Sequence, residues 1–259
     1  MRLPRVQWHW LIFALVVCVI RPLAVDAADE PTFTRKQIRQ FLLNAEVVGS
    51  RQDPRGFSHP WRLTLTNGTV THDASFQIRD ENNKSYQYNI AASELAEMLG
   101  LEDTLPVYVE REWHGKWGSL SWWLPLQMDE EERLKRKVEP PDLEGWNKQI
   151  DNMRVFDALV DESETHPRDL LIGKDWKIYR VDYSRGFLLD RDLQKPMSLV
   201  RCDRNLLQKL KDLNGHQLEQ KTKGYLTRSE VQAVMARRDK ILAHFRSLIV
   251  EKGENVVLF

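Results

Sequence analysis

The residues of this sequence best suited to chemistry are acidic side chains that fall in two clusters between residues 155 and 187. One is the run Asp-Glu-Ser-Glu at 161–164, and the other is the pair Asp169 and Asp182, which flank an apolar segment. Carboxylate oxygens are the ligands that Mg²⁺ and Mn²⁺ prefer, and a carboxylate beside a hydroxyl can act as a general base. The residue types therefore indicate metal-assisted chemistry, although a polar loop that only caps a helix has the same composition.

Two predicted elements position these side chains. Apolar residues at helical spacing predict a helix over residues 153–160 that ends at the acidic run. After it, residues 170–172 are apolar, 173–175 have turn composition, and 176–181 read as a returning strand. The resulting β-hairpin would hold Asp169 at its entry and Asp182 at its exit.

This order of helix, acidic loop, hairpin and aspartate resembles the catalytic segment of atypical kinases of the HipA and phosphoinositide-kinase-like type. In that family Asn-x-Asp-Arg-His-x-x-Asn-x-Leu is followed by a hairpin and by Ile-Asp-His/Tyr-x-x-x-Phe. With His166 as the pivot, the resemblance implies that Glu164 is the catalytic base. It also implies that Asp169 and Asp182 bind the metal, while Thr165 replaces the arginine of the motif.

The chain before residue 128 has the pattern of an antiparallel meander with helices. Strands are predicted over residues 45–50, 61–65, 74–78, 105–109 and 118–124. Helices are predicted over residues 34–44 and 86–99, with Gly100 as the C-cap of the second. The resemblance places these elements in the small lobe of a kinase.

In the kinases resembled, a lysine of the third strand and a glutamate of the next helix hold the nucleotide phosphates. This chain has Gln77 and Asn89 at those positions, so the resemblance implies them as its nucleotide-binding residues. Without the lysine, neutralisation of the phosphates would fall to the metal, Arg168 or Arg79. Removing such a charge costs orders of magnitude in rate.

Beyond residue 127 the sequence predicts helices around the hairpin. The charged stretch 128–142 is expected to connect two lobes as a solvated helix or loop. A helix is predicted over 205–213, and the capping box Thr227-x-x-Glu230 opens another that runs to about residue 251. The expected fold is therefore α+β and two-lobed, protein-kinase-like: a small antiparallel β-sheet lobe with one helix at 28–127, and a mainly helical C-terminal lobe carrying the hairpin at 128–259.

Residues 1–27 have the pattern of a signal peptide, since Arg2 and Arg5 precede an apolar run that ends before small residues. That run is shorter than the roughly 18 residues of a membrane-spanning helix. We expect cleavage after Ala27 and export to the periplasm or the extracellular space, with an uncleaved anchor as the alternative.

Charge and cysteine content limit the function further. The 38 basic and 38 acidic residues balance, which gives no electrostatic case for nucleic acid or an anionic membrane. Only Cys202 remains after cleavage, so no internal disulfide can form, and we expect a partly buried thiol rather than a nucleophile.

Two functions follow from the resemblance. One is an exported phosphotransferase that uses ATP with Mg²⁺ or Mn²⁺ through Glu164, Asp169 and Asp182. The alternative is a catalytically inactive pseudokinase that binds a protein partner or acts as a scaffold, which export favours because little ATP is found outside the cell. A metal-dependent phosphate-ester hydrolase is a third option. A nucleotide and a protein are the expected partners, and nucleic acid and, after signal cleavage, a membrane are not.

Overall fold

The computed structural model describes residues 33–52, 60–78, 85–162 and 165–259, of which Thr34–Phe259 form one compact unit. The predicted signal peptide lies outside these residues. Within them, every helix is too short or too polar to cross a bilayer.

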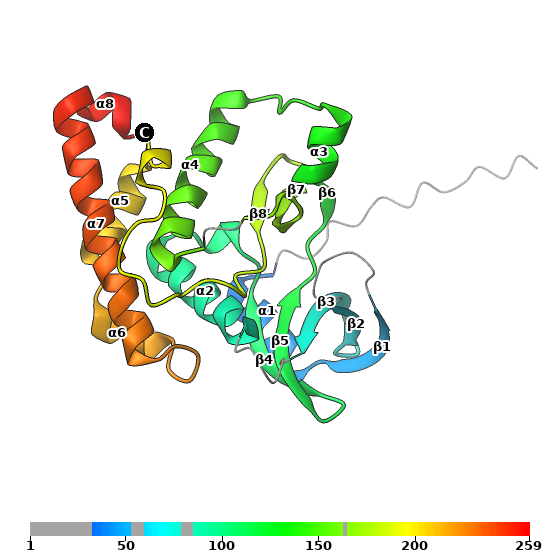
Figure 1. Cartoon of the computed structure of the whole chain (residues 1–259). Coiled ribbons are helices and arrows are strands. Elements are labelled where there is room, and N and C mark those ends of the chain that lie inside the picture. Colours follow the sequence, from blue (N-terminus) through cyan, green and yellow to red (C-terminus); the bar gives the residue numbers. More distant parts are fainter. Residues whose placement is uncertain (1–32, 53–59, 79–84, 163–164) are drawn as a thin grey trace, which may run out of the picture. The chain divides into compact units, whose positions relative to one another are not determined.

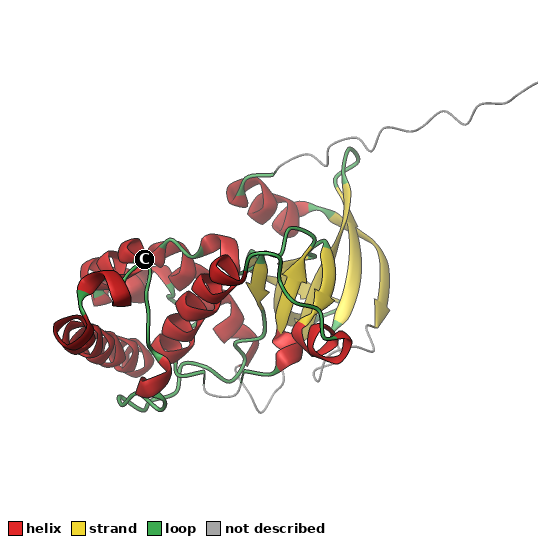
Figure 2. Cartoon of the chain, turned by 90° about the horizontal axis from the view of Figure 1, so that it is seen from above, coloured by secondary structure: helices red, strands yellow, loops and turns green. Residues whose placement is uncertain are grey.

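The N-terminal half contains a five-stranded antiparallel sheet, drawn in yellow in Figure 2. Its strands are β1 (Glu46–Gln52), β2 (Trp61–Thr66), β3 (Thr71–Ile78), β4 (Tyr108–Trp113) and β5 (Lys116–Trp122). They lie in the order β1-β2-β3-β5-β4 (Figure 1). Leu63, Leu65, Ala74 and Phe76 alternate along β2 and β3 and are fully buried, which confirms the predicted meander.

Two helices accompany this sheet. Helix α1 (Arg35–Asn44) begins at Thr34, whose hydroxyl forms a capping box with Gln37. Helix α2 (Ser85–Leu99) buries Ala91, Ala92 and Ala96, whose small side chains permit close approach of neighbouring elements. Its partners include β4 and β5 on one side and two C-terminal helices on the other. Helix α2 therefore connects the sheet to the helical half of the chain.

Charged side chains tie α2 to its neighbours. Arg35 and Arg39 of α1 reach Glu97, with nitrogen to oxygen distances of 3.1 and 2.9 Å. From helix α6 (Gly215–Lys221), the Lys221 ammonium lies 2.9 Å from Oε2 of Glu94. Glu94 and Glu97 of α2 thus form ion pairs with α1 on one side and with α6 on the other.

The central hairpin forms as predicted, within a second sheet of order β6-β7-β8. Its strands are β7 (Leu170–Gly173) and β8 (Ile178–Arg180), and Trp176 lies in the turn with a positive φ rather than in the returning strand. Strand β6 (Leu126–Asp129) and helix α3 (Glu130–Arg136) occupy the start of the segment predicted as a charged connector. The two-lobe boundary after residue 127 stays a prediction.

Helices make up the rest of the C-terminal half. They are α4 (Leu143–Val160), α5 (Arg204–Asp212), α6, α7 (Arg228–Lys252) and α8 (Glu254–Val257). The Thr227 and Glu230 capping box of α7 is confirmed. Helix α4 begins at Leu143, ten residues earlier than predicted, with Asp142 as its N-cap; Leu143, Trp146 and Ile150 continue the helical apolar spacing toward the N-terminus.

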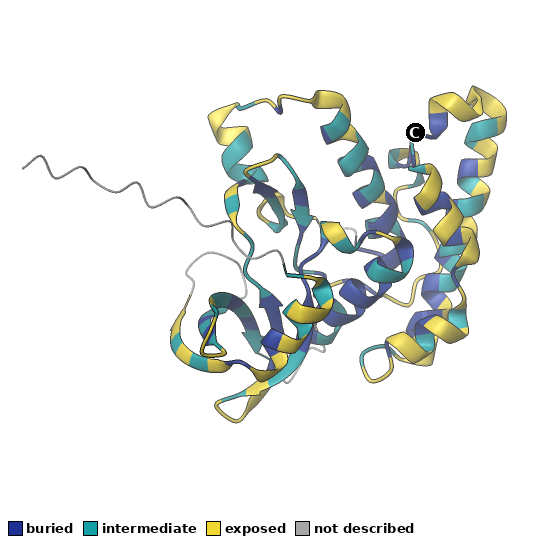
Figure 3. Cartoon of the chain, turned by 180° about the vertical axis from the view of Figure 1, so that it is seen from behind, coloured by how far each residue is buried: buried dark blue, intermediate teal, exposed yellow. Residues whose placement is uncertain are grey.

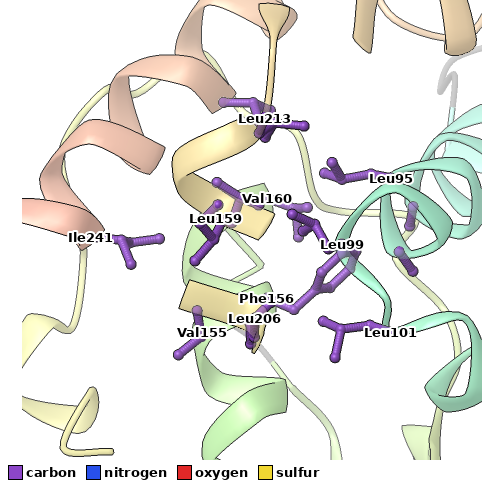
Figure 4. Packing of buried hydrophobic residues seen from close by; sticks show 14 of the residues in the cluster. Leu95, Leu99, Leu101, Val155, Phe156, Leu159, Val160, Leu206, Leu213 and Ile241 are labelled. Atoms are coloured by element: carbon purple, nitrogen blue, oxygen red, sulfur yellow. The ribbon is translucent and has the colours of Figure 1, made fainter. Parts of the chain in front are cut away.

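Two separate apolar clusters stabilise these halves. One lies between the sheet and α1, and the larger joins α2 to α4, α5 and α7. Figure 4 shows Leu95, Phe156, Leu159, Leu206 and Ile241 converging in the larger cluster. Figure 3 shows that α4, α5 and α7 turn buried residues inward and exposed residues outward. The predicted α+β class is confirmed, with a small antiparallel sheet and a mainly helical half that carries the hairpin.

Cys202 lies in the larger cluster and is fully buried, more deeply than predicted. Burial raises the pKa of its thiol to about 12, so the group stays protonated at neutral pH. The expectation that Cys202 is no nucleophile agrees with this environment.

Candidate functional site

The two residues implied as nucleotide-binding lie on different elements and contact each other. Gln77 is near the end of β3, and Asn89 is in the second turn of α2. The Asn89 amide nitrogen donates a hydrogen bond of 2.7 Å to Oε1 of Gln77. Asn89 is almost wholly buried, whereas Gln77 is partly exposed.

The same asparagine also binds the segment after the central hairpin. Its Oδ1 accepts a hydrogen bond of 2.7 Å from the backbone N–H of Tyr183, the residue after Asp182. The structure therefore brings Gln77, Asn89 and the Asp182 segment together, although they are far apart in the sequence.

Asp182 has a left-handed backbone, with φ of 61°, and its side chain is partly exposed. Its Oδ1 accepts a 3.3 Å hydrogen bond from the backbone N–H of Ser184. Beside it, Tyr108 of β4 is buried, and its pKa is raised first by that burial and then by the charge of Asp182. The carboxylate of Asp182 thus lies where β4 meets the end of the hairpin.

Asp169 ends the short 3-10 helix Pro167–Asp169, which leads into β7. Its pKa is raised from 3.8 to about 6, mainly by burial; the charge of Arg180 opposes the shift and the nearby charge of Asp182 adds to it. The two predicted metal ligands therefore lie close enough to interact. Their binding of a metal stays a prediction.

Arg180 of β8 is fully buried at this place. Its Nη1 lies 3.7 Å from Oδ2 of Asp169, and its Nε lies 3.9 Å from Oδ1 of Asp157. The guanidinium carbon lies 4.7 Å from the centre of the Tyr183 ring, a cation–π distance. Nη1 also donates to the carbonyl oxygen of Val181. The centre of the site is thus a buried positive charge.

Asp157 of α4 completes the acidic surroundings of Arg180. Its Oδ1 accepts a 3.1 Å hydrogen bond from the Tyr183 hydroxyl, and its Oδ2 accepts one of 3.0 Å from the Thr165 hydroxyl. Burial raises the pKa of this carboxyl, and the charge of Arg180 opposes the shift. We call Arg180, Asp157 and Asp169 the acid cluster.

Sequence reasoning missed Arg180 and Asp157. The signal for Arg180 was an arginine in a short strand between apolar Ile178 and Val181, where its side chain has to enter the interior. Asp157 carried a similar signal, since it lies among the apolar residues of the predicted helix and one turn before the acidic run.

The predicted catalytic base, Glu164, lies outside the described residues, as does Arg79. Arg168 is described and exposed, and its Nε lies 2.7 Å from Oε2 of Glu131 in α3. A role for Arg168 in neutralising phosphate would require it to leave that carboxylate.

Across the described ranges, no three histidine, cysteine, aspartate or glutamate side chains converge as a set of metal ligands. Two surface hollows of this part of the chain lie elsewhere. One is between β1 and the end of β4, with Trp113 and His114 in its wall, and the other lies between α6 and α7. In the acid cluster, Arg180 is fully buried, whereas the side chains of Asp157 and Asp169 are partly exposed.

Comparisons with known proteins find similarity in structure but not in sequence. No protein-family model matches the chain, and no curated protein matches its sequence significantly. The fold is similar to the crystal structure of a Helicobacter pylori proinflammatory kinase, CtkA, with 11% identity and a TM-score of 0.48. The match covers 82% of this chain and 98% of that one. A similarity of this extent leaves the chemistry of the site to its own residues.

Proposed function

We propose that this chain is a kinase-like binding module that does not transfer phosphoryl groups. The observation that supports this most directly is the uncharged hydrogen-bonded pair Gln77–Asn89. The kinases that the sequence resembles have a lysine and a glutamate there, and the lysine neutralises the nucleotide phosphates. Two neutral amides supply no such charge.

The hydrogen bonds of Asn89 support the same proposal. Its amide nitrogen is engaged with Gln77 and its oxygen with the Tyr183 backbone. Breaking either bond to bind a ligand would leave a buried polar group unpaired, which costs about 1–3 kcal/mol. The pair therefore connects β3, α2 and the Asp182 segment. This structural role accounts for both hydrogen bonds of Asn89 without a bound nucleotide.

The residues on the acidic side do not fit the divalent cation that a kinase requires. Oδ2 of Asp169 lies 3.7 Å from Nη1 of Arg180, whose positive charge would repel Mg²⁺ or Mn²⁺ bound to that carboxylate. Since Arg180 is fully buried, it cannot turn outward to a phosphate instead.

The alternative is an exported phosphotransferase using Glu164, Asp169 and Asp182 with ATP and a divalent cation. One observation favours it: Asp169 and Asp182 lie close enough for their charges to interact, as a shared ligand would require. Export, which the N-terminal pattern predicts, favours the binding module, because such a function needs no ATP. The partner in that proposal is a protein.

Thermal unfolding of the full chain with ATP and either Mg²⁺ or Mn²⁺ tests the proposal. A ligand present at 100 times its Kd stabilises by about 2.7 kcal/mol, which is several degrees in Tm for a chain of this size. We expect no shift with either metal.

A shift in the wild type that disappears in Asp182→Ala would contradict the binding module and support the phosphotransferase. Asp175→Ala is the matched control, since Asp175 is an exposed aspartate in the turn of the same hairpin. Its response to ATP has to equal that of the wild type.

A further inference from the structure

Arg180 lies beside Asp169, one of the two predicted metal ligands, and beside Asp157. Its guanidinium is within 4 Å of carboxylate oxygens from two elements, α4 and the short helix before β7. The negative charge of Glu162, in the acidic run 161–164, also acts on Arg180. Arginine stays protonated in proteins, so this positive charge is permanent.

The guanidinium is held in place by its own segment. Nη1 donates to the Val181 carbonyl oxygen, and the Tyr183 ring lies against the planar group. Tyr183 is itself fixed at both ends, by its N–H to Asn89 and by its hydroxyl to Asp157. The cation is therefore part of the folded framework.

The interaction with the two carboxylates is mainly one of charge. Nε and Nη2 of Arg180 are buried and have no hydrogen-bond partner among the described residues. Such donors in an open site would suggest an anion as ligand. Here the surrounding carboxylates of Asp157, Asp169 and Glu162 would repel an anion, so the guanidinium acts as their counter-ion instead.

We propose that Arg180 is an internal cation that takes the place of a divalent metal ion at Asp169, one of the two predicted metal ligands, and that it also offsets the charge of Asp157. Its single positive charge neutralises part of the negative charge of the two carboxylates, so the folded chain needs no metal there. This inference deepens the proposed function and rests on it, because a site neutralised from within holds no metal against nucleotide phosphates.

The test uses MgCl₂ or MnCl₂ alone, without nucleotide, on the full chain. The wild type is expected to have the same Tm in EDTA and in either metal. Arg180→Met removes the cation and leaves buried carboxylates unbalanced, so its Tm is expected to fall by roughly 10 °C. Either metal should then restore several degrees, and Asp169→Asn in the same background should abolish that recovery.

Two variants serve as controls. Arg180→Lys retains a charge, so it should be more stable than Arg180→Met and should not respond to metal. Arg168→Met removes an exposed arginine paired with Glu131, outside the acid cluster, and should behave as the wild type.

A metal-induced rise in the Tm of the wild type that Asp169→Asn abolishes would overturn the inference. A folded Arg180→Met chain that does not respond to metal would also overturn it. If Arg180→Met does not fold, Asp169→Asn in the wild-type background decides, because its change in Tm should be the same in EDTA and in metal. A shift with ATP and metal, but none with metal alone, would contradict the proposed function instead.

Discussion

The two contacts that meet at Tyr183 differ in kind. On the sheet side, Gln77, Asn89 and the Tyr183 backbone are joined by two hydrogen bonds of 2.7 Å and carry no formal charge. On the other side, Arg180 lies 3.7 and 3.9 Å from two carboxylates, and all three groups are charged. One contact is balanced by hydrogen bonding and the other by opposite charges.

The difference shows which changes each contact tolerates. Hydrogen bonds between amides do not depend on pH and depend little on salt. A buried cluster of charges is sensitive to any loss of one member, because the remaining charges are then unbalanced in a poorly solvated place. The neutral contact joins the two residues that the resemblance implies as nucleotide-binding, while the charged contact includes Asp169, one of the two predicted metal ligands.

The largest expected effect is that of Arg180→Met. Breaking a buried ion cluster by removing one partner typically costs about 3–5 kcal/mol. Urea denaturation should give a loss of this size in the free energy of unfolding. A loss below about 1 kcal/mol would mean that the carboxylates are balanced by another group or are solvated.

The next effect is a dependence of stability on pH through Asp169. Its folded pKa, about 6, is above its ordinary value of 3.8, so the folded chain binds this proton more tightly than the unfolded chain. Its contribution to stability is complete below pH 3.8 and is lost as the pH rises through 6. The loss is on the order of 2–3 kcal/mol.

Asp169→Asn removes this titration. The unfolding free energy of the wild type minus that of this variant should therefore decrease as the pH rises from 4 to 7. Urea denaturation at several pH values measures it, and a difference that stays constant with pH would contradict the raised pKa.

A smaller effect is expected on the neutral side. Asn89→Ala leaves the Tyr183 N–H without its acceptor and should cost about 1–3 kcal/mol. In a double-mutant cycle, Gln77→Ala and Asn89→Ala should show a coupling of about 0.5–1.5 kcal/mol. The coupling should be the same in low and high salt, and a clear salt dependence would argue against a neutral contact.

The smallest effect is expected for Arg168→Met. Its ion pair with Glu131 is between exposed side chains, where solvent and salt screen the attraction. The Tm should remain within experimental error of the wild type. A large fall would place Arg168 in the acid cluster rather than on the surface.

Local patterns in the sequence predicted local structure well. The helix start at Thr34, the capping box at Thr227 and the turn after Gly173 depend on residues within a few positions of one another. Strand β6 was missed because four residues with one buried methionine carry no periodic signal, and their pairing with β7 is a tertiary contact.

The sequence predicted only those residues of the site that a family motif selects. Alignment with a family motif selected Gln77, Asn89, Asp169 and Asp182, and the structure brings the first two into contact. Arg180 could not be found in this way, since the motif assigns it no role. Its function depends on Asp157, 23 positions away, which becomes its neighbour only when α4 packs against the hairpin.

The ion pairs that join α2 to α1 and α6 affect the rate at which its amide protons exchange. Glu94 and Glu97 are held from both sides, and the helix is buried between the sheet and the C-terminal helices. Opening α2 would therefore require both halves of the chain to separate from it. We expect its amide protons to exchange with deuterium at the slow rate of global unfolding. A partner would then meet a surface whose shape is already fixed before binding.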